Sequence, residues 1–200
     1  MLKAFAALHS PEVLRMPSFK EMLVLRSTYR EAVVEHLFLG QLLPLYWRVK
    51  PRRPIEVSKP LVDDAGYDLI LEVPGIVRHV QLKSSLRTSK TRQQNVHERL
   101  AEKPSGCVVW ITHDNDFNIG PFRWFGKDPG VPLPCLSAFK HAKAPRGNAQ
   151  GERPIRPSLY EVPRSAFEEM DRIEDVCRRL FGNSHCAPAV ETSASESPPR

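Results

Sequence analysis

Three polar residues on two predicted strands have the side-chain types needed for phosphodiester hydrolysis. Asp68 lies in the β-prone segment Tyr67–Val73, and Gln81 and Lys83 lie at the end of Ile76–Lys83. This hydrolysis needs an activated water and compensation for the charge that grows on the phosphate, and Mg²⁺ can supply both. Mg²⁺ takes oxygen ligands and needs only one or two carboxylates. We therefore expect Asp68 to be the main metal ligand, Gln81 to offer its amide oxygen, and Lys83 to orient the water or stabilise the transition state.

The turn between these strands provides a reason for the three side chains to converge. Pro74-Gly75 is a turn dipeptide, which favours an antiparallel hairpin. A symmetric loop places Asp68 opposite Gln81, and opposed residues point to the same face. Gln81 and Lys83 share that face because they are two residues apart on a strand. A loop of odd length would instead move Asp68 to the other face.

An apolar helical segment offers a third metal ligand, Glu35. The segment runs from about Ser27 to Trp47, and Glu35 lines up with Phe38 and Leu42 on its apolar stripe. A carboxylate in such a stripe is costly unless it meets a metal or another cation. Glu31, one turn earlier on the same side, is the alternative.

The remaining periodicity predicts a mixed α/β chain. The first helix is expected to kink or end near Pro44. A polar helix over Thr88–Glu102 and a continuous apolar strand over Cys107–Thr112 follow the hairpin. Four further elements are expected: an edge strand within Phe117–Phe125, long ordered loops over Lys127–Pro157, a strand over Leu159–Val162, and a helix over Arg164–Phe181 that stops at Gly182.

This order of elements and polar residues resembles the PD-(D/E)XK nuclease superfamily, which includes restriction endonucleases and Holliday-junction resolvases. A helix with Glu35 precedes Gly66-Tyr67-Asp68, which opens a strand, and Gln81-Leu82-Lys83 ends the next strand. The resemblance covers roughly residues 28–112. It implies a restriction-endonuclease-like αβββαβ core, with a mixed central sheet flanked by helices and an extra C-terminal strand and helix.

The same resemblance implies a role for each candidate residue. Asp68 matches the metal-binding Asp of the superfamily, Lys83 its catalytic Lys, and Glu35 the helix glutamate of the resolvase-like branch. Gln81 stands where Asp or Glu is usual, so this chain is a QxK variant whose neutral side chain binds Mg²⁺ less tightly. Asp63 and Asp64 could compensate if their loop folds back.

Basic residues follow the motif and recur later in the chain. Phosphate contacts of Lys and Arg position a nucleic acid without reading its sequence. An ordinary basic loop surface is the alternative interpretation. Gln93, on the inner side of the predicted helix, is expected to support the site. The basic candidates for nucleic-acid binding are Arg87, Lys90 and Arg92 after the motif, and Lys143 and Arg146 in a Pro/Gly-rich segment that also holds Lys140, Arg153 and Arg156.

Composition bounds the class of protein. The 200 residues predict one nuclease-like domain over residues 1–182, with a core at about 28–112, an extension at 113–182 and a disordered tail at 183–200. A net charge of +6 is compatible with a polyanionic partner. The four cysteines form no CxxC pair, which argues against a zinc knuckle. The sequence shows no signal peptide or membrane-spanning run, so we expect a cytoplasmic protein with reduced thiols.

These observations support one leading hypothesis and two alternatives. The leading one is an endonuclease that depends on Mg²⁺ or Mn²⁺ and hydrolyses phosphodiester bonds in DNA. A homodimer would then supply two sites for two strands. The alternatives are a catalytically inactive nucleic-acid-binding domain on the same fold, and a protein-interaction domain whose basic loop binds a partner protein.

Overall fold

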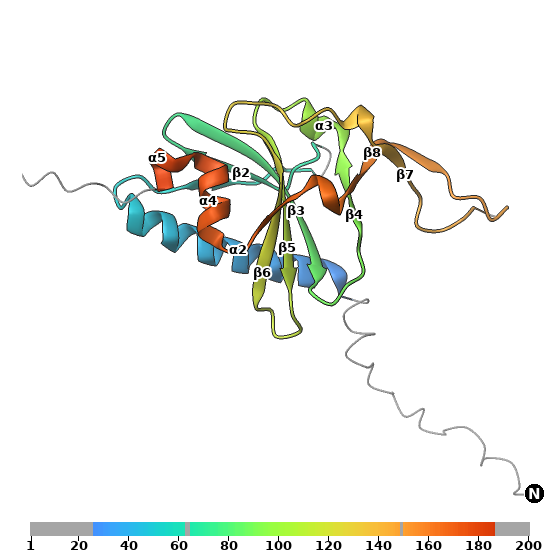
Figure 1. Ribbon diagram of the computed structural model, residues 1–200, viewed down its shortest axis with the longest axis horizontal. Coiled ribbons are helices and arrows are strands. Elements are labelled where there is room, and N and C mark those ends of the chain that lie inside the picture. The colour runs from blue at the N-terminus through green and yellow to red at the C-terminus, as the bar shows by residue number, and fades with distance from the viewer. Residues whose placement is uncertain (1–25, 63–64, 149, 187–200) are drawn as a thin grey trace, which may run out of the picture.

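A six-stranded mixed sheet forms the centre of the molecule (Figure 1). The computed structural model describes residues 26–62, 65–148 and 150–186. Only β3 and β5 run parallel, and the other neighbouring pairs are antiparallel. The mixed sheet expected from the sequence is therefore confirmed. Its strands, in spatial order, are β1 (Glu56–Ser58), β2 (Leu69–Val73), β3 (Ile76–Leu86), β5 (Gly106–His113), β6 (Ile119–Gly126) and β9 (Glu168–Met170).

A smaller sheet and several helices complete the architecture. The smaller sheet has the order β4-β8-β7, with β4 at Gln93–His97, β8 at Ile155–Pro163 and β7 at Lys140–Lys143. The two longer helices are α2 (Ser27–Val49) and α4 (Ile173–Phe181). The shorter ones are α3 (Glu98–Ala101), α5 (Asn183–Cys186) and the 3₁₀ turns η1 (Leu136–Ala138) and η2 (Arg164–Ala166).

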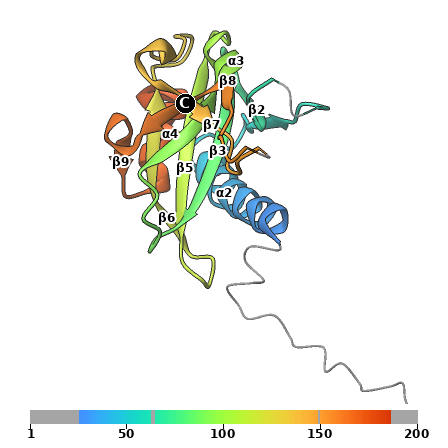
Figure 2. The same cartoon turned by 90° about the vertical axis from the view of Figure 1, so that its right-hand side faces the viewer.

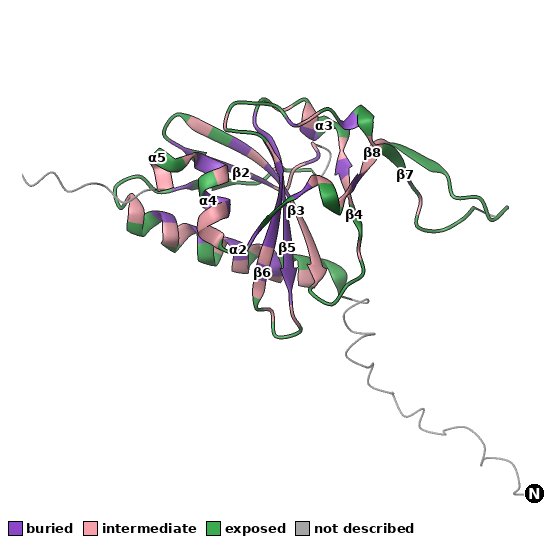
Figure 3. Cartoon of the chain, viewed as in Figure 1, coloured by how far each residue is buried: buried purple, intermediate pink, exposed green. Residues whose placement is uncertain are grey.

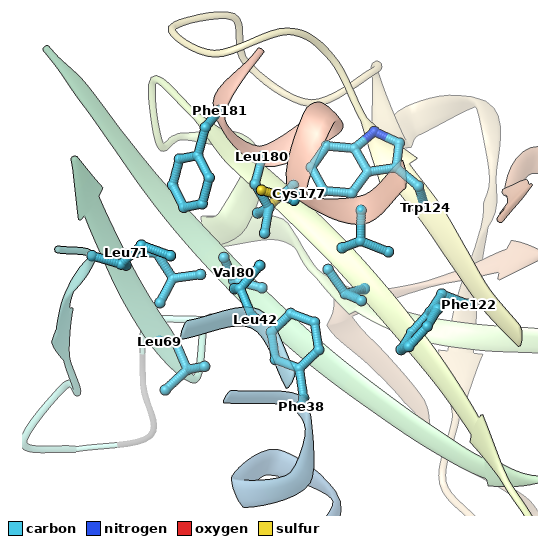
Figure 4. Close-up of a cluster of buried hydrophobic side chains, with 14 of the residues drawn as sticks. Phe38, Leu42, Leu69, Leu71, Val80, Phe122, Trp124, Cys177, Leu180 and Phe181 are labelled. Carbon is cyan, nitrogen blue, oxygen red and sulfur yellow. The ribbon is translucent and has the colours of Figure 1, made fainter. Parts of the chain in front are cut away.

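The two longer helices cover one face of the six-stranded sheet. α2 buries a stripe of residues spaced four apart, and Phe38 and Leu42 from this stripe meet the sheet residue Val80 (Figure 4). Leu180 and Phe181 of α4 close the same cluster. Complete burial of one such side chain stabilises the fold by roughly 1.5–3 kcal/mol. This cluster therefore fixes α2, and with it Glu35, against the sheet.

The opposite face of the sheet packs against the smaller sheet. The central strand β5 is buried along its whole length, and its side chains alternate between two cores. Val109 points to the core beneath the helices, whereas Val108 and Trp110 point to a second core that includes Val96 and Val162 of the smaller sheet. The continuous apolar run of the sequence is thus explained by a strand that is covered on both faces.

The hairpin of β2 and β3 has the predicted register. Val73 pairs with Ile76 and Leu69 pairs with Val80. β3 continues to Leu86, six residues beyond Val80, and there it pairs only with β5 among the described strands. The far half of β3 therefore presents an open edge of the main sheet, and the candidate residues lie at this edge.

The predicted helix over Thr88–Glu102 is wrong. Gln93–His97 forms strand β4, and only the four residues Glu98–Ala101 are helical. β4 pairs with Leu159–Pro163, more than sixty residues later in the chain. Ladder hydrogen bonds to this distant partner override the local helical preference of a polar, capped segment.

The C-terminal elements also differ from the expectation in part. The helix expected from Arg164 begins only at Ile173, because Glu168–Met170 pairs with β6 as strand β9. Its stop at Gly182 is confirmed, with φ at 81°. The region 113–182 is part of the fold, since β6 and β9 belong to the main sheet and α4 covers it.

Two further expectations are corrected at helix ends. α2 does not end at Pro44 but continues to Val49, held by the burial of Leu42 and Tyr46 on either side of the proline. The sequence predicts disorder from Asn183, but Asn183–Cys186 forms the helical turn α5; residues 187–200 lie outside the described part. Within the described ranges, no helix is both long enough and apolar enough to cross a bilayer.

Candidate active site

A cleft of about 740 Å³ crosses the open edge of β3. α2 forms one wall, β4 and β8 form the other, and the floor comes from β3, β5 and the residue before β2. Three of the four predicted catalytic residues, Glu35, Asp68 and Lys83, line this cleft. The full lining is Thr28, Glu31, Ala32, Val34 and Glu35 from α2, Gln93, Gln94, Asn95 and Glu161 from the smaller sheet, and Asp68, Leu82, Lys83, Ser84 and Ile111 from the floor.

Asp68 is held in place by the backbone of β3. Its N–H donates to the carbonyl oxygen of Val80 at 2.9 Å, and its Oδ2 accepts a hydrogen bond from the N–H of Leu82 at 2.6 Å. The Leu82 amide lies at the open edge, where a neighbouring strand would otherwise accept its hydrogen bond. Hydrogen bonds to an ionised acceptor are short and strong. The carboxylate of Asp68 is therefore fixed at the open edge of β3.

Gln81 and Lys83 point to the face of β3 that meets the smaller sheet. Their register neighbours on β5 are Val108 and Trp110, which belong to the core between the sheets. Lys83 is half-buried and lines the cleft, whereas Gln81 is only 7% exposed and does not line it.

The buried amide oxygen of Gln81 has no hydrogen-bond partner among the described residues. A buried acceptor without a partner costs about 1–3 kcal/mol. Native structures rarely leave such an atom without a protein group, a water or an ion. The position next to the cleft therefore suits a bound cation or donor.

Glu35 enters the cleft from the opposite layer. Its side chain is 15% exposed, and it forms an ion pair with Lys59. This ion pair offsets the cost of placing a carboxylate beside the apolar stripe. Glu31, the alternative one turn earlier, also lines the cleft but is exposed. Because the edge of β3 is open, groups from both sides of the sheet can meet there.

The donor atoms of this site suit a hard divalent cation. Asp68 and Glu35 offer carboxylate oxygens and Gln81 offers an amide oxygen, the ligand types that Mg²⁺ prefers. The residues described by the structure contain no cluster of three His, Cys, Asp or Glu side chains that could hold a metal. The three expected ligands do not form such a cluster, because the third of them, Gln81, is an amide. Asp63 and Asp64, expected to compensate, lie outside the described residues.

The wall formed by the smaller sheet was missed by the sequence reasoning. Gln94, Asn95 and Glu161 line the cleft, and Asn95 is the register partner of Glu161 across β4 and β8. Gln93 was expected near the site on a helix; it does line the cleft, but from a strand. No local signal marks these residues, because their placement depends on the long-range pairing of β4 with β8.

Arg87, expected to bind nucleic acid, holds the β5–β6 turn. Its guanidinium donates to the carbonyl oxygens of Gly120 at 2.8 Å and Asn118 at 3.1 Å, and it lies 3.5 Å from the carboxylate of Asp114. Asp114 in turn accepts hydrogen bonds from Asn118, which lower the pKa of its carboxyl group. Asp114 is thus engaged in capping the loop that follows β5.

The other basic candidates lie on exposed segments outside the cleft. Lys90 and Arg92 belong to the exposed segment between β3 and β4, whereas Lys143 and Arg146 lie on and beyond β7. The structure therefore brings three of the four predicted catalytic residues into one cleft. It does not place these four basic side chains in that cleft.

His79 shares the face of Gln81 but does not line the cleft. Its ring contacts the ring of Tyr67, with 4.9 Å between centroids. Burial, and to a smaller extent the charge of Lys103, lowers the pKa of His79. His79 is therefore a packed, neutral side chain near neutral pH.

Comparisons with known proteins return one structural likeness. No protein-family model matches the chain, and no curated protein matches it. Among solved structures, the chain is similar to the bacterial homing endonuclease I-Ssp6803I, with 25% sequence identity over 56% of this chain and 67% of that one, at a TM-score of 0.25.

Proposed function

We propose that this chain is a metal-dependent nuclease that cleaves phosphodiester bonds in DNA. The observation that carries the proposal is the meeting of Asp68, Lys83 and Glu35 in one cleft, at the point where β3 loses its partner strand. The buried, unpartnered amide oxygen of Gln81 lies two residues from Lys83 on the same face. The net charge of +6 suits a polyanionic substrate.

Each side chain has a role that follows from its position. Asp68, Gln81 and Glu35 would hold the cation, and Glu35 would exchange its contact with Lys59 for this one. A bound Mg²⁺ or Mn²⁺ supplies charge stabilisation and an activated water. The Lys83 ammonium would donate hydrogen bonds to a phosphate oxygen or to the attacking water as negative charge grows. The backbone hydrogen bonds of Asp68 keep its carboxylate oriented before substrate arrives, which lowers the cost of reaching the reactive geometry.

A second copy of the chain would complete the reaction on duplex DNA. One cleft cuts one strand, so cleavage of both strands needs a second site or a second binding event. We propose a homodimer on DNA for this reason.

One observation favours an alternative function, a non-cleaving nucleic-acid-binding domain. Gln81 brings no charge, and the Glu35 carboxylate is already neutralised by Lys59. Such a domain would bind DNA with a marked salt dependence but would not hydrolyse it.

The test is a cleavage assay with matched variants. Plasmid, linear duplex and single-stranded DNA are incubated with the chain in Mg²⁺, Mn²⁺ or EDTA. Asp68→Asn and Lys83→Met should each lower the rate by about 100-fold or more, because they remove charge from the reacting centre. Asp116→Asn and Lys127→Met change residues outside the cleft and should cleave like the wild type.

Two results would reject the nuclease proposal. One is cleavage that persists in EDTA or in both cleft variants, since it would come from a contaminant or another site. The other is DNA binding without cleavage under every metal condition, which would establish the non-cleaving alternative.

A further inference from the structure

Residues 140–148 and 150–156, here called the basic ribbon, project from the body of the molecule. Lys143 pairs with Ile155 and Ala142 with Arg156, and the ribbon extends away from the main sheet (Figure 1). Figure 2 views the molecule from the side on which the ribbon projects, where the first turns of α2 also lie. Nearly all of the ribbon is exposed (Figure 3). An isolated two-stranded ribbon gains little stability from its own strands, and beyond the buried Ala142 its described residues are almost all open to a ligand.

The ribbon concentrates the positive charge of the chain. It carries five basic residues against a single acid, Glu152, so its net charge is +4 compared with +6 for the whole chain. Across residues 26–62, 65–148 and 150–186, none of the five basic side chains forms an ion pair. The five are Lys140, Lys143, Arg146, Arg153 and Arg156.

The far end of the ribbon is ordered by its own hydrogen bonds. The Oδ1 of Asn148 accepts from the N–H groups of Gln150 at 3.1 Å and Glu152 at 2.9 Å. The Arg153 guanidinium donates to the carbonyl oxygen of Pro145 at 2.8 Å, which ties the two sides together. A binding loop held in one shape loses less conformational entropy when it binds.

The ribbon is joined to the cleft through one strand. β8 carries Arg156 in the ribbon and Glu161 in the cleft wall. At about 3.3 Å per residue, these two positions are at most roughly 17 Å apart along the strand. This span corresponds to about five base pairs of duplex, at roughly 3.4 Å each. A duplex with its scissile phosphate in the cleft would therefore pass the ribbon within half a helical turn.

We propose that the basic ribbon enters the major groove of double-stranded DNA and thereby selects duplex as the substrate of the neighbouring cleft. This inference rests on the proposed nuclease function. The major groove of B-DNA is about 12 Å wide and admits a two-stranded ribbon, whereas that of A-form RNA is deep and narrow. Surfaces that bind single strands stack bases on aromatic rings, and residues 140–156 include no Phe, Tyr or Trp. Arg146 and Gln150, near the far end, have the side-chain types that recognise guanine and adenine edges.

The test measures binding in EDTA, so that it does not depend on cleavage. Fluorescence anisotropy compares a duplex with the single strand of the same sequence over a range of salt concentrations. The triple variant Lys143→Gln, Arg146→Gln, Arg156→Gln should lower duplex affinity by about 10- to 100-fold. The plot of log binding constant against log salt concentration should also become less steep. Its slope should fall by about one for each phosphate that the variant no longer neutralises. Its affinity for the single strand should change by less than about threefold, because the groove is absent.

A matched control removes the same charge elsewhere. Arg48→Gln, Arg52→Gln, Arg53→Gln changes one residue in the last turn of α2 and two in the turn that follows it, outside the cleft and the ribbon. This control should bind duplex within about twofold of the wild type, since charge near the DNA matters more than net charge.

Three results would overturn the inference. The ribbon variant could bind duplex as tightly as the wild type, the control could lose as much affinity, or both nucleic-acid forms could lose equally. In each case the ribbon does not select duplex DNA. Metal-dependent cleavage by the wild type would still support the proposed nuclease function. If instead duplex binding depends on the ribbon but no metal supports cleavage, the proposed nuclease function is rejected. The ribbon would then remain a surface that binds duplex DNA.

Discussion

Arginine side chains near α4 and on the basic ribbon occupy contrasting environments. The α4 side of the molecule pairs its arginines with acids, whereas no ribbon residue has an acidic partner in the described chain. The α4-side pairs are Arg123 with Glu169 at 2.7 Å, Arg172 with Glu174 at 3.0 Å, Arg178 with Asp175, and Arg179 with Glu168.

The difference separates charge that organises the protein from charge that is available to a partner. A paired arginine near the sheet contributes to folding through its hydrogen bonds and packing, while an exposed pair contributes only about 0–1 kcal/mol. An unpaired lysine or arginine on an exposed ribbon contributes little to folding but can displace counterions from phosphate. Substitution of the buried Arg123 should therefore change stability, and substitutions on the ribbon should change binding.

The largest stability effect is expected at Arg123. Its guanidinium is 5% exposed, pairs with Glu169 and lies 5.3 Å from the centroid of the Trp110 ring. Arg123→Met should cost about 2 kcal/mol, because it removes a charged hydrogen bond and a cation–π contact. For a chain of this size, this cost lowers Tm by roughly 4 to 8 °C, which differential scanning calorimetry can measure.

The matched substitution on the ribbon is Arg146→Met. It should change the free energy of unfolding by less than about 0.5 kcal/mol, as exposed substitutions usually do, while weakening duplex binding. If Arg146→Met destabilised the protein as much as Arg123→Met, the proposed difference between the two regions would be contradicted.

A smaller effect, on activity, is expected from Lys59→Gln. Lys59 forms an ion pair with Glu35 at the cleft. If Glu35 is a metal ligand, removing its competing partner should lower the Mg²⁺ concentration for half-maximal cleavage by a few-fold. A metal titration of the cleavage rate checks this. A higher metal requirement would mean that Lys59 supports the site and that its pairing with Glu35 is part of the working geometry.

The smallest effect concerns pH and the packed ring of His79. Burial lowers the pKa of His79 below its ordinary value of 6.5. Between the two pKa values the folded protein binds fewer protons than the unfolded chain, so stability rises with pH up to about 6.5 and is lost on acidification. Thermal melts of His79→Phe between about pH 5 and 7 should show a flatter dependence than the wild type. An unchanged slope would show that other groups set the acid sensitivity.

The part of the site that depends on local geometry was predictable from the sequence. The Pro74-Gly75 turn sets the register that places Asp68 beside β3, and the helical spacing of α2 places Glu35 toward the sheet. Both signals act over a few residues, where turn chemistry and apolar periodicity decide the structure.

The wall opposite α2 was not predictable in the same way. Gln93–His97 has no strong strand signal and becomes β4 only because Leu159–Pro163 returns to pair with it. The buried position of Gln81 likewise depends on two sheets meeting over β5. The charge of the ribbon was visible in the sequence, but its projection from the cleft wall required the three-dimensional pairing.

The most direct test of the metal site is the Mn²⁺ dependence of duplex cleavage in Gln81→Glu compared with the wild type. A carboxylate in place of the amide adds charge to the site, so half-maximal cleavage should need about tenfold less Mn²⁺. Gln41→Glu, an exposed control on α2 outside the cleft, should leave the titration unchanged. Equal Mn²⁺ dependence in all three proteins, or cleavage that continues in EDTA, would contradict a metal held by Asp68 and Gln81 at the open edge of β3.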